Sequence, residues 1–161
     1  ALMLEVPQVI MRTAPAGPLR DGAEWIQKLL GDAERTAVHL VVLPEELPVS
    51  EALELHHRLR DDLGLTQGFV VANRCLPDPF SAGEDCLTRA GSAPLSGMDG
   101  LVEAARNLKR RLNLQEVYLD RLRAGMDQAV VCLPEWEQPD FGAQAIDALA
   151  DAFGAAEGGA P

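Results

Sequence analysis

Shortages of aromatic residues and of lysine narrow what this chain can be. Aromatic residues make up 4% of the 161 positions while 47% are hydrophobic, so the core must consist mainly of leucine, valine and alanine. Lys28 and Lys109 are the only lysines, and the chain contains neither G-x-x-x-x-G-K-[ST] nor G-x-G-x-x-G. It also lacks H-E-x-x-H and G-x-S-x-G. The sequence therefore carries no recognisable catalytic centre of its own.

Cysteine, positive charge and long apolar runs are also scarce. The net charge of −11 argues against binding to nucleic acid or to an anionic membrane. No apolar run reaches membrane-spanning length, so we expect no direct membrane insertion. Cys75 and Cys86 bracket a loop and could form a disulfide, but free thiols in a cytoplasmic protein are expected instead. Cys132 lies in an apolar run and is expected to be a small core residue.

The centre of the chain has the pattern of a β-α-β unit. The apolar runs Ala37–Leu43 and Gly68–Ala72 predict two strands, and Ser50–Leu63 between them has helical periodicity with Gly64 as its stop. Residues 45–48 (EELP) are expected to form a loop. Because both runs are apolar at successive positions, we expect parallel strands covered on two faces, with a right-handed crossover.

The flanking segments complete one predicted α/β domain with fewer strands than usual. The start of the chain, residues 1–13, is expected to form a helical turn, a break at Pro7 and a second short helix. With only three predicted strands, we expect part of the sheet to be missing at the start of the chain. The other predicted elements are a helix over Leu19–Leu30, an irregular loop over Leu76–Gly100, a helix over Met98–Leu122, a strand over Ala129–Leu133 and a helix over Phe141–Phe153.

Candidate ligand-binding residues lie where the predicted strands end, because open α/β sheets bind ligands beyond these ends. An amide such as that of Asn73 offers a donor and an acceptor together, which suits the edge of a purine base. The same amide could instead cap the turn after the strand. The strand ends are Pro44-Glu45-Glu46, Asn73-Arg74 and Leu133-Pro134-Glu135.

The histidines and the basic residues have plainer explanations. His39 lies within the alternating pattern of a predicted strand and is expected to be a hydrogen-bonded core residue. His56 and His57 are adjacent and are expected at the surface or in a groove. The basic cluster Arg106–Arg111 is either a solvated helix face or a contact for an acidic partner. The loop over Leu76–Gly100 is either a surface insertion or a functional segment.

Several segments together resemble a known family. The order and spacing of HLVVLPEELPVSEALELHHRL, GFVVANR, QEVYLDRLR and AVVCLPEWEQPDFGAQAIDALADAF are similar to the latter half of the ArsA-type ATPases. These are dimeric members of the deviant Walker-A class of P-loop NTPases, and ALMLEVPQVI resembles the segment that follows their switch II motif. The resemblance implies an α/β fold that is part of a parallel P-loop NTPase-like sheet flanked by helices, with its first half missing. Residues 1–154 would form this part and 155–161 a flexible tail.

The resemblance also implies which residues bind nucleotide. Asn73 matches the asparagine that hydrogen-bonds adenine, and Leu133, Pro134 and Glu135 match the turn that covers the base. Glu45 matches a position near the nucleotide edge and the dimer face. ATP and Mg²⁺ are the implied cofactors, with the Mg²⁺ site outside this chain.

Departures from the family limit these expectations. The phosphate loop and the switch residues are absent, so ATP hydrolysis would need an N-terminal P-loop half, in the same protein or in a partner chain. The C-x-x-C that holds zinc across the dimer of the targeting ATPases is absent as well. The alternative is a non-catalytic interaction module that keeps the fold without nucleotide and contacts a protein partner through residues 76–111.

Overall fold

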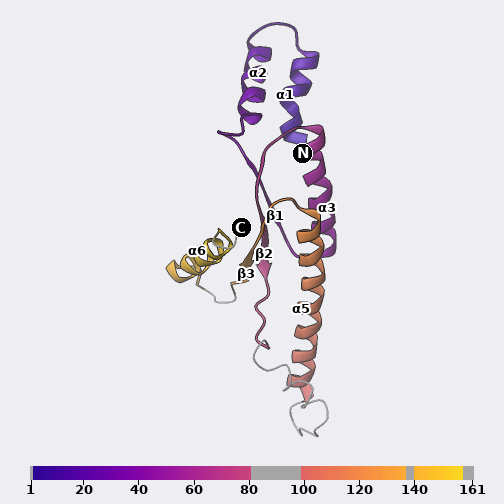
Figure 1. Cartoon of the computed structure of the whole chain (residues 1–161), viewed down its shortest axis with the longest axis vertical. Helices are drawn as coiled ribbons and strands as arrows, with labels where there is room; N and C mark the ends of the chain where they lie inside the picture. The colour runs from indigo at the N-terminus through magenta and orange to yellow at the C-terminus, as the bar shows by residue number, and fades with distance from the viewer. Residues whose placement is uncertain (1, 81–98, 137–139, 158–161) are drawn as a thin grey trace.

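A parallel sheet lies at the centre of the computed structural model, which describes residues 2–80, 99–136 and 140–157 (Figure 1). In the described part the sheet has three strands in the order β1-β2-β3, all parallel. The strands are β1 (Val38–Val42), β2 (Gln67–Cys75) and β3 (Val130–Pro134). The predicted α/β class is therefore confirmed.

The predicted β-α-β unit is present, but its helix differs from the prediction in two ways. Helix α3 (Glu46–His57) begins four residues earlier than expected, so the prediction of a loop over residues 45–48 is wrong. Pro48 fits inside α3 because a residue in the first turn of a helix needs no partner for its backbone nitrogen. The helix then continues as a π-helical turn, η1 (Arg58–Asp62), and ends at Gly64, whose φ of 61° favours glycine.

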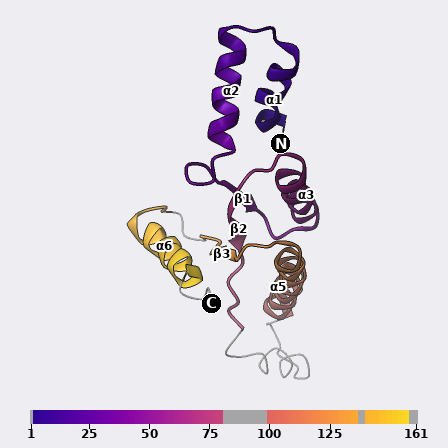
Figure 2. The same cartoon turned by 45° about the horizontal axis from the view of Figure 1, so that its top comes forward.

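Helices cover the two faces of the sheet unequally, as Figures 1 and 2 show. Helices α3 and α5 (Asp99–Gly125) lie on one face, which we call the closed face. Helix α6 (Ala143–Glu157) lies on the other face, which we call the open face, and packs against β3. The main core lies under α3 and α5, and its sheet residues are Leu40, Val42, Val70, Ala72 and Cys75.

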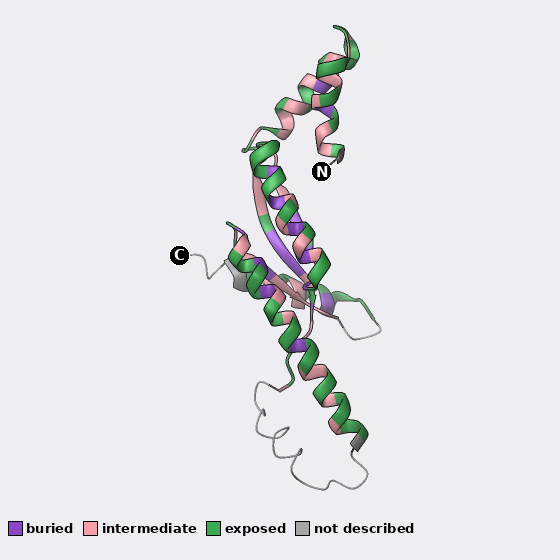
Figure 3. Ribbon diagram, turned by 90° about the vertical axis from the view of Figure 1, so that its right-hand side faces the viewer, coloured by how far each residue is buried: buried purple, intermediate pink, exposed green. Residues whose placement is uncertain are grey.

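The open face is buried only in part, whereas α3 and α5, which lie toward the viewer in Figure 3, cover the closed face. Val71 and Val131 are buried there with Ala145 of α6, but Val41 of β1 is 67% exposed. The prediction that β1 is covered on both faces is therefore wrong. His39 is also exposed rather than in the core, yet it is hydrogen-bonded, because its Nδ1 accepts from the backbone N–H of Phe69 at 2.9 Å.

Two helices form a hairpin at one end of the molecule (Figure 1). They are α1 (Leu2–Thr13) and α2 (Pro18–Leu30). The predicted break at Pro7 is wrong, because this proline removes only one backbone donor near the start of α1 and the helix continues past it. An ion pair of 2.7 Å between Glu5 and Arg58 joins α1 to η1.

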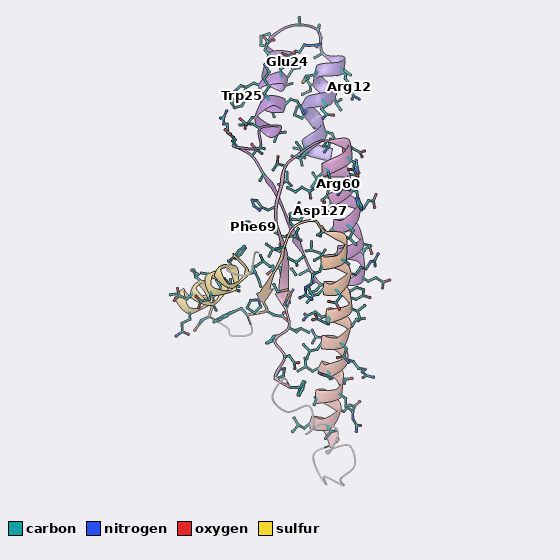
Figure 4. The ribbon with its side chains drawn as sticks, viewed as in Figure 1. Arg12, Glu24, Trp25, Arg60, Phe69 and Asp127 are labelled. Carbon is teal, nitrogen blue, oxygen red and sulfur yellow. The ribbon has the colours of Figure 1, made fainter. Side chains whose placement is uncertain are left out.

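The two neighbouring histidines of α3 have opposite environments. His56 is buried, so its predicted surface position is wrong, whereas His57 is exposed as expected. The Nδ1 atom of His56 lies 2.7 Å from Oε1 of Gln67, whose side-chain amide donates to the backbone carbonyl of His56. Nearby, Arg60 of η1 reaches Asp127 at 2.7 Å, which joins η1 to the segment after α5 (Figure 4).

Some predicted features lie outside the described residues. These are Cys86, residues 81–98 of the predicted loop, and residues 158–161 of the tail. Within the described part, no helix combines the length and the apolar character needed to cross a bilayer.

Candidate functional site

The carboxyl ends of the three strands open onto a pocket of about 350 Å³. Because the strands are parallel, these ends meet at one edge of the sheet, beside the middle of α5. The sheet side of the pocket is lined by Leu43, Pro44, Glu45, Glu46, Arg74, Leu76 and Glu135, and the α5 side by Arg111, Leu114, Gln115 and Tyr118.

An ion pair crosses from β2 to the end of β3 at the pocket. The guanidinium of Arg74 donates to Oε1 of Glu135 from Nη2 at 2.5 Å and from Nε at 3.2 Å. This hydrogen bond, with the charges of Glu135 and Glu45, raises the pKa of Arg74 above its ordinary value. The backbone N–H of Glu135 also donates to the carbonyl of Cys75 at 2.8 Å, which fixes the turn after β3 against β2.

A β-bulge presents Arg74 to the pocket. Ala72 pairs with Cys132 and Cys75 pairs with Pro134, so Asn73 and Arg74 together oppose a single residue of β3. Arg74 has a φ of 58°, which is uncommon for a residue other than glycine. Such conformations gather at binding sites, and here the bulge turns the arginine toward the end of the sheet.

Helix α5 is attached to the strand end through one glutamine. Oε1 of Gln115 accepts from the backbone N–H of Leu76 at 2.7 Å, and its Nε2 donates to the Leu76 carbonyl at 3.4 Å. The side-chain amide of Gln115 thus bonds both backbone groups of Leu76, as a neighbouring strand would just beyond β2. Leu114 and Tyr118, one turn of helix apart, form part of the wall beside it.

The structure gathers some of the predicted residues and not others. Glu45 and Glu135 line the pocket. Asn73 lies within β2 and is half-buried, and Leu133 and Pro134 are half-buried in β3; these three are absent from the lining. Nucleotide binding by any of them stays a prediction.

Sequence reasoning missed the contribution of α5 to this site. Arg111 belongs to the basic cluster for which the sequence predicts a solvated face or a partner contact, yet it lines the pocket. The sequence contained one weak signal that this part of α5 lines a site. Gln115 and Tyr118 are polar residues on the turns between the buried Leu112 and Leu119. Their role depends on where α5 crosses the strand ends, which no local pattern contains.

A Mg²⁺ site needs oxygen ligands gathered around one point. Among the described residues, no group of three or more histidine, cysteine or carboxylate side chains is placed to hold a metal ion. The pocket carboxylates therefore do not fit a metal centre by themselves.

Comparison with known proteins relates the chain to mycobacterial ATPases. Over 135 residues it is 34% identical to ATPase BagA of Mycobacterium tuberculosis (strain H37Rv) and to a Mycobacterium bovis protein that is provisionally named an ATPase. The alignments cover 84% of this chain but 32% of each relative, so the chain spans about a third of the length of the relatives it matches. No family model matches the chain.

Proposed function

We propose that this chain is the adenine-nucleotide-binding C-terminal portion of an ArsA-like ATPase. The observation that carries the proposal is the convergence of three parallel strand ends on one pocket of about 350 Å³. That volume is within the range of small-molecule sites, and this edge of an open α/β sheet is where such ligands bind. The similarity to proteins named ATPases supports a nucleotide as the ligand.

The pocket combines the two kinds of surface that a nucleotide needs. Leucine and tyrosine side chains from α5 and the strand ends offer an apolar wall for the base. Asn73, Leu133 and Pro134 lie in the adjoining strand ends and not in the pocket lining; Asn73 is proposed to hydrogen-bond adenine there, with Leu133, Pro134 and Glu135 as the turn over the base and Glu45 at the nucleotide edge. Arg74 and Arg111 supply positive charge at the same pocket, where an anionic ligand would compete with Glu135 for Arg74.

Hydrolysis is assigned to residues outside this chain. The chain has no phosphate loop, and the relatives are about three times as long as the matched region. We propose that an N-terminal P-loop half binds the phosphates and Mg²⁺, and that it adjoins the exposed side of β1. This segment would then orient the base, and homodimer formation would be a property of the whole ATPase.

Asn73→Ala in the full-length protein tests the proposal. Loss of a hydrogen bond to the base costs about 1 kcal/mol, so we expect the Kd for ATP to rise roughly fivefold to tenfold. The Kd for GTP should change less, because guanine presents a different donor and acceptor edge. Titration calorimetry with both nucleotides measures the two values.

Asn113→Ala is the matched control, because Asn113 is exposed on α5 and does not line the pocket. It should leave both Kd values unchanged. Equal weakening of ATP and GTP by Asn73→Ala, with an unchanged unfolding midpoint, would contradict base recognition by this residue. Absence of ATP binding to the full-length protein would overturn the proposed function.

A further inference from the structure

A groove of about 290 Å³ lies between β1 and α3. Side chains of successive strand residues point to opposite faces of a sheet, so a groove on one face would touch only every second residue. This groove instead touches four successive residues, so it follows the edge of β1. Its lining consists of Leu40, Val41, Val42 and Leu43 on the strand side and of Pro48, Glu51, Ala52 and Leu55 on the α3 side.

In the described part of the chain, this edge of β1 has no neighbouring strand, because β1 pairs with β2 alone. The backbone N–H of Val38 donates at 2.8 Å to the carbonyl that precedes β2. Backbone groups of successive strand residues point to opposite edges, and the extra residue in this pairing lies in β2. Val38, Leu40 and Val42 therefore turn their backbone groups to β2. The N–H and C=O groups of His39 and Val41 point to the groove.

Strand β1 lacks the features by which edge strands usually avoid further pairing. Such strands carry charged side chains, a proline or a bulge of their own. The sequence of β1, VHLVV, has no lysine, carboxylate or proline, and the bulge in its ladder belongs to β2. The other edge strand, β3, ends in Pro134 and packs against α6. The edge of β1 is therefore suited to accept an added strand.

The side chains around the groove determine the chemistry of such a strand. Leu40, Val42 and Ala52 are buried apolar residues on the closed side of the edge, and Val41 on the open side is exposed. Among the described residues that line the groove, Glu51 alone is charged. A strand beside β1 would thus meet apolar surface with both of its faces. A continuous apolar run, typical of a strand inside a parallel sheet, fits this surface better than an alternating one.

We propose that a strand from the part of the protein outside these 161 residues adds to the edge of β1 and continues the sheet. The chain spans about a third of the length of its relatives, so they have ample chain for further strands. The inference rests on the proposed N-terminal half and specifies how that half is attached. Backbone hydrogen bonds to His39 and Val41 hold the added strand, and its apolar side chains fill the groove.

Hydrogen exchange of the full-length protein, resolved at single residues, tests this attachment. We expect the amides of His39 and Val41 to exchange as slowly as those of Leu40 and Val42, because strands on both sides of β1 would bond all four. Fast exchange at His39 and Val41, with slow exchange at the other two, would overturn the proposal. Protection that disappears on dilution to the monomer would also overturn it, since the occupant would then be a second copy.

Val41→Pro removes a backbone donor at the free edge and leaves the donors that bond to β2. In the full-length protein we expect fast exchange at His39, slow exchange at Leu40 and Val42, and a lower urea midpoint. Val41→Thr is the matched control, because it keeps the N–H, and it should leave exchange at His39 slow. Slow exchange at His39 in Val41→Pro would contradict the added strand. Should Val41→Pro fail to fold, the four amides of the unchanged protein decide the question.

Titration of the same full-length protein with ATP separates this inference from the proposed function. Slow exchange at His39 and Val41 in a protein that does not bind ATP would support the added strand and overturn the nucleotide site. Fast exchange at both residues in a protein that binds ATP would overturn the added strand and leave the nucleotide site in place.

Discussion

The two faces of the sheet differ although both are built from the same kinds of residue. On the closed face, Val42 of β1 is 5% exposed and packs beneath α3 and α5 with the main core. On the open face, the adjacent Val41 is 67% exposed, because α6 packs on β3 rather than on β1. Val41 and Val42 therefore share a residue type and a strand but not an environment.

This difference shows what an apolar run can and cannot indicate. The run Ala37–Leu43 correctly predicted a strand, since β-branched residues favour extended backbone. It did not show whether both faces are covered, because cover comes from elements elsewhere in the chain or in a longer protein. If burial rather than residue type decides stability, matched substitutions on the two faces should have very different costs.

The largest difference should come from a leucine of α5 that faces the closed side. Leu122 is 0% exposed and Leu101 of the same helix is 62% exposed. Leu122→Ala removes buried methyl groups and leaves a cavity, so we expect the free energy of unfolding to fall by roughly 2–5 kcal/mol. Urea denaturation measures this change.

Leu101→Ala is the control for helix propensity, because alanine is at least as good a helix former as leucine. It should change the free energy of unfolding by less than about 0.5 kcal/mol. A cost for Leu101→Ala that matches the cost for Leu122→Ala would show that burial in the closed face is not what distinguishes the two positions.

The sequence predicted those parts of the fold that follow from local pattern. The strands, the helices around them and the stop at Gly64 all agree with periodicity and glycine chemistry. The sequence also predicted the parallel pairing of β1 and β2, because a helix that connects two apolar strands lets the second run in the same direction as the first. Of the predicted site residues, Glu45 and Glu135 reached the pocket simply because they follow the ends of β1 and β3.

Two irregularities in β2 escaped prediction, and each changes which face of the sheet a side chain occupies. One extra residue lies between the Val38–Gln67 and Leu40–Val70 pairs, and another lies before Cys75. Each bulge reverses the alternation of the strand, which brings Gln67 to His56 on the closed face and Cys75 into the main core. Bulges depend on the register of the neighbouring strands, which a single segment does not contain.

A smaller effect is expected where β1 and β2 meet on the open face. A Cβ at Gly68 would lie 2.4 Å from Cε1 of His39, so Gly68→Ala must push the imidazole away. His39 would then lose its hydrogen bond to the Phe69 N–H and its stacking on the Phe69 ring. We expect a loss of about 1 kcal/mol in the free energy of unfolding, measured by urea denaturation.

A double-mutant cycle identifies the histidine as the cause. In a His39→Ala background the obstacle is gone, so Gly68→Ala should be neutral or stabilise the protein by up to about 0.5–1 kcal/mol, as alanine does relative to glycine within strands. An equal cost of Gly68→Ala in both backgrounds would place the strain in the backbone and not at His39.

The smallest effect should come from Val41→Thr on the open face. Threonine keeps the β-branched shape and the strand preference of valine, and its hydroxyl at this exposed position can bond to water. We expect a change in the free energy of unfolding of less than about 0.5 kcal/mol in the 161-residue chain. Val42→Thr, one residue along β1, should cost about 1–3 kcal/mol, because its hydroxyl would be buried under α3 and α5 without a partner. Equal costs at the two positions would mean that the open side of β1 is covered in solution. Repeating the pair in the full-length protein would show whether the proposed N-terminal half provides that cover.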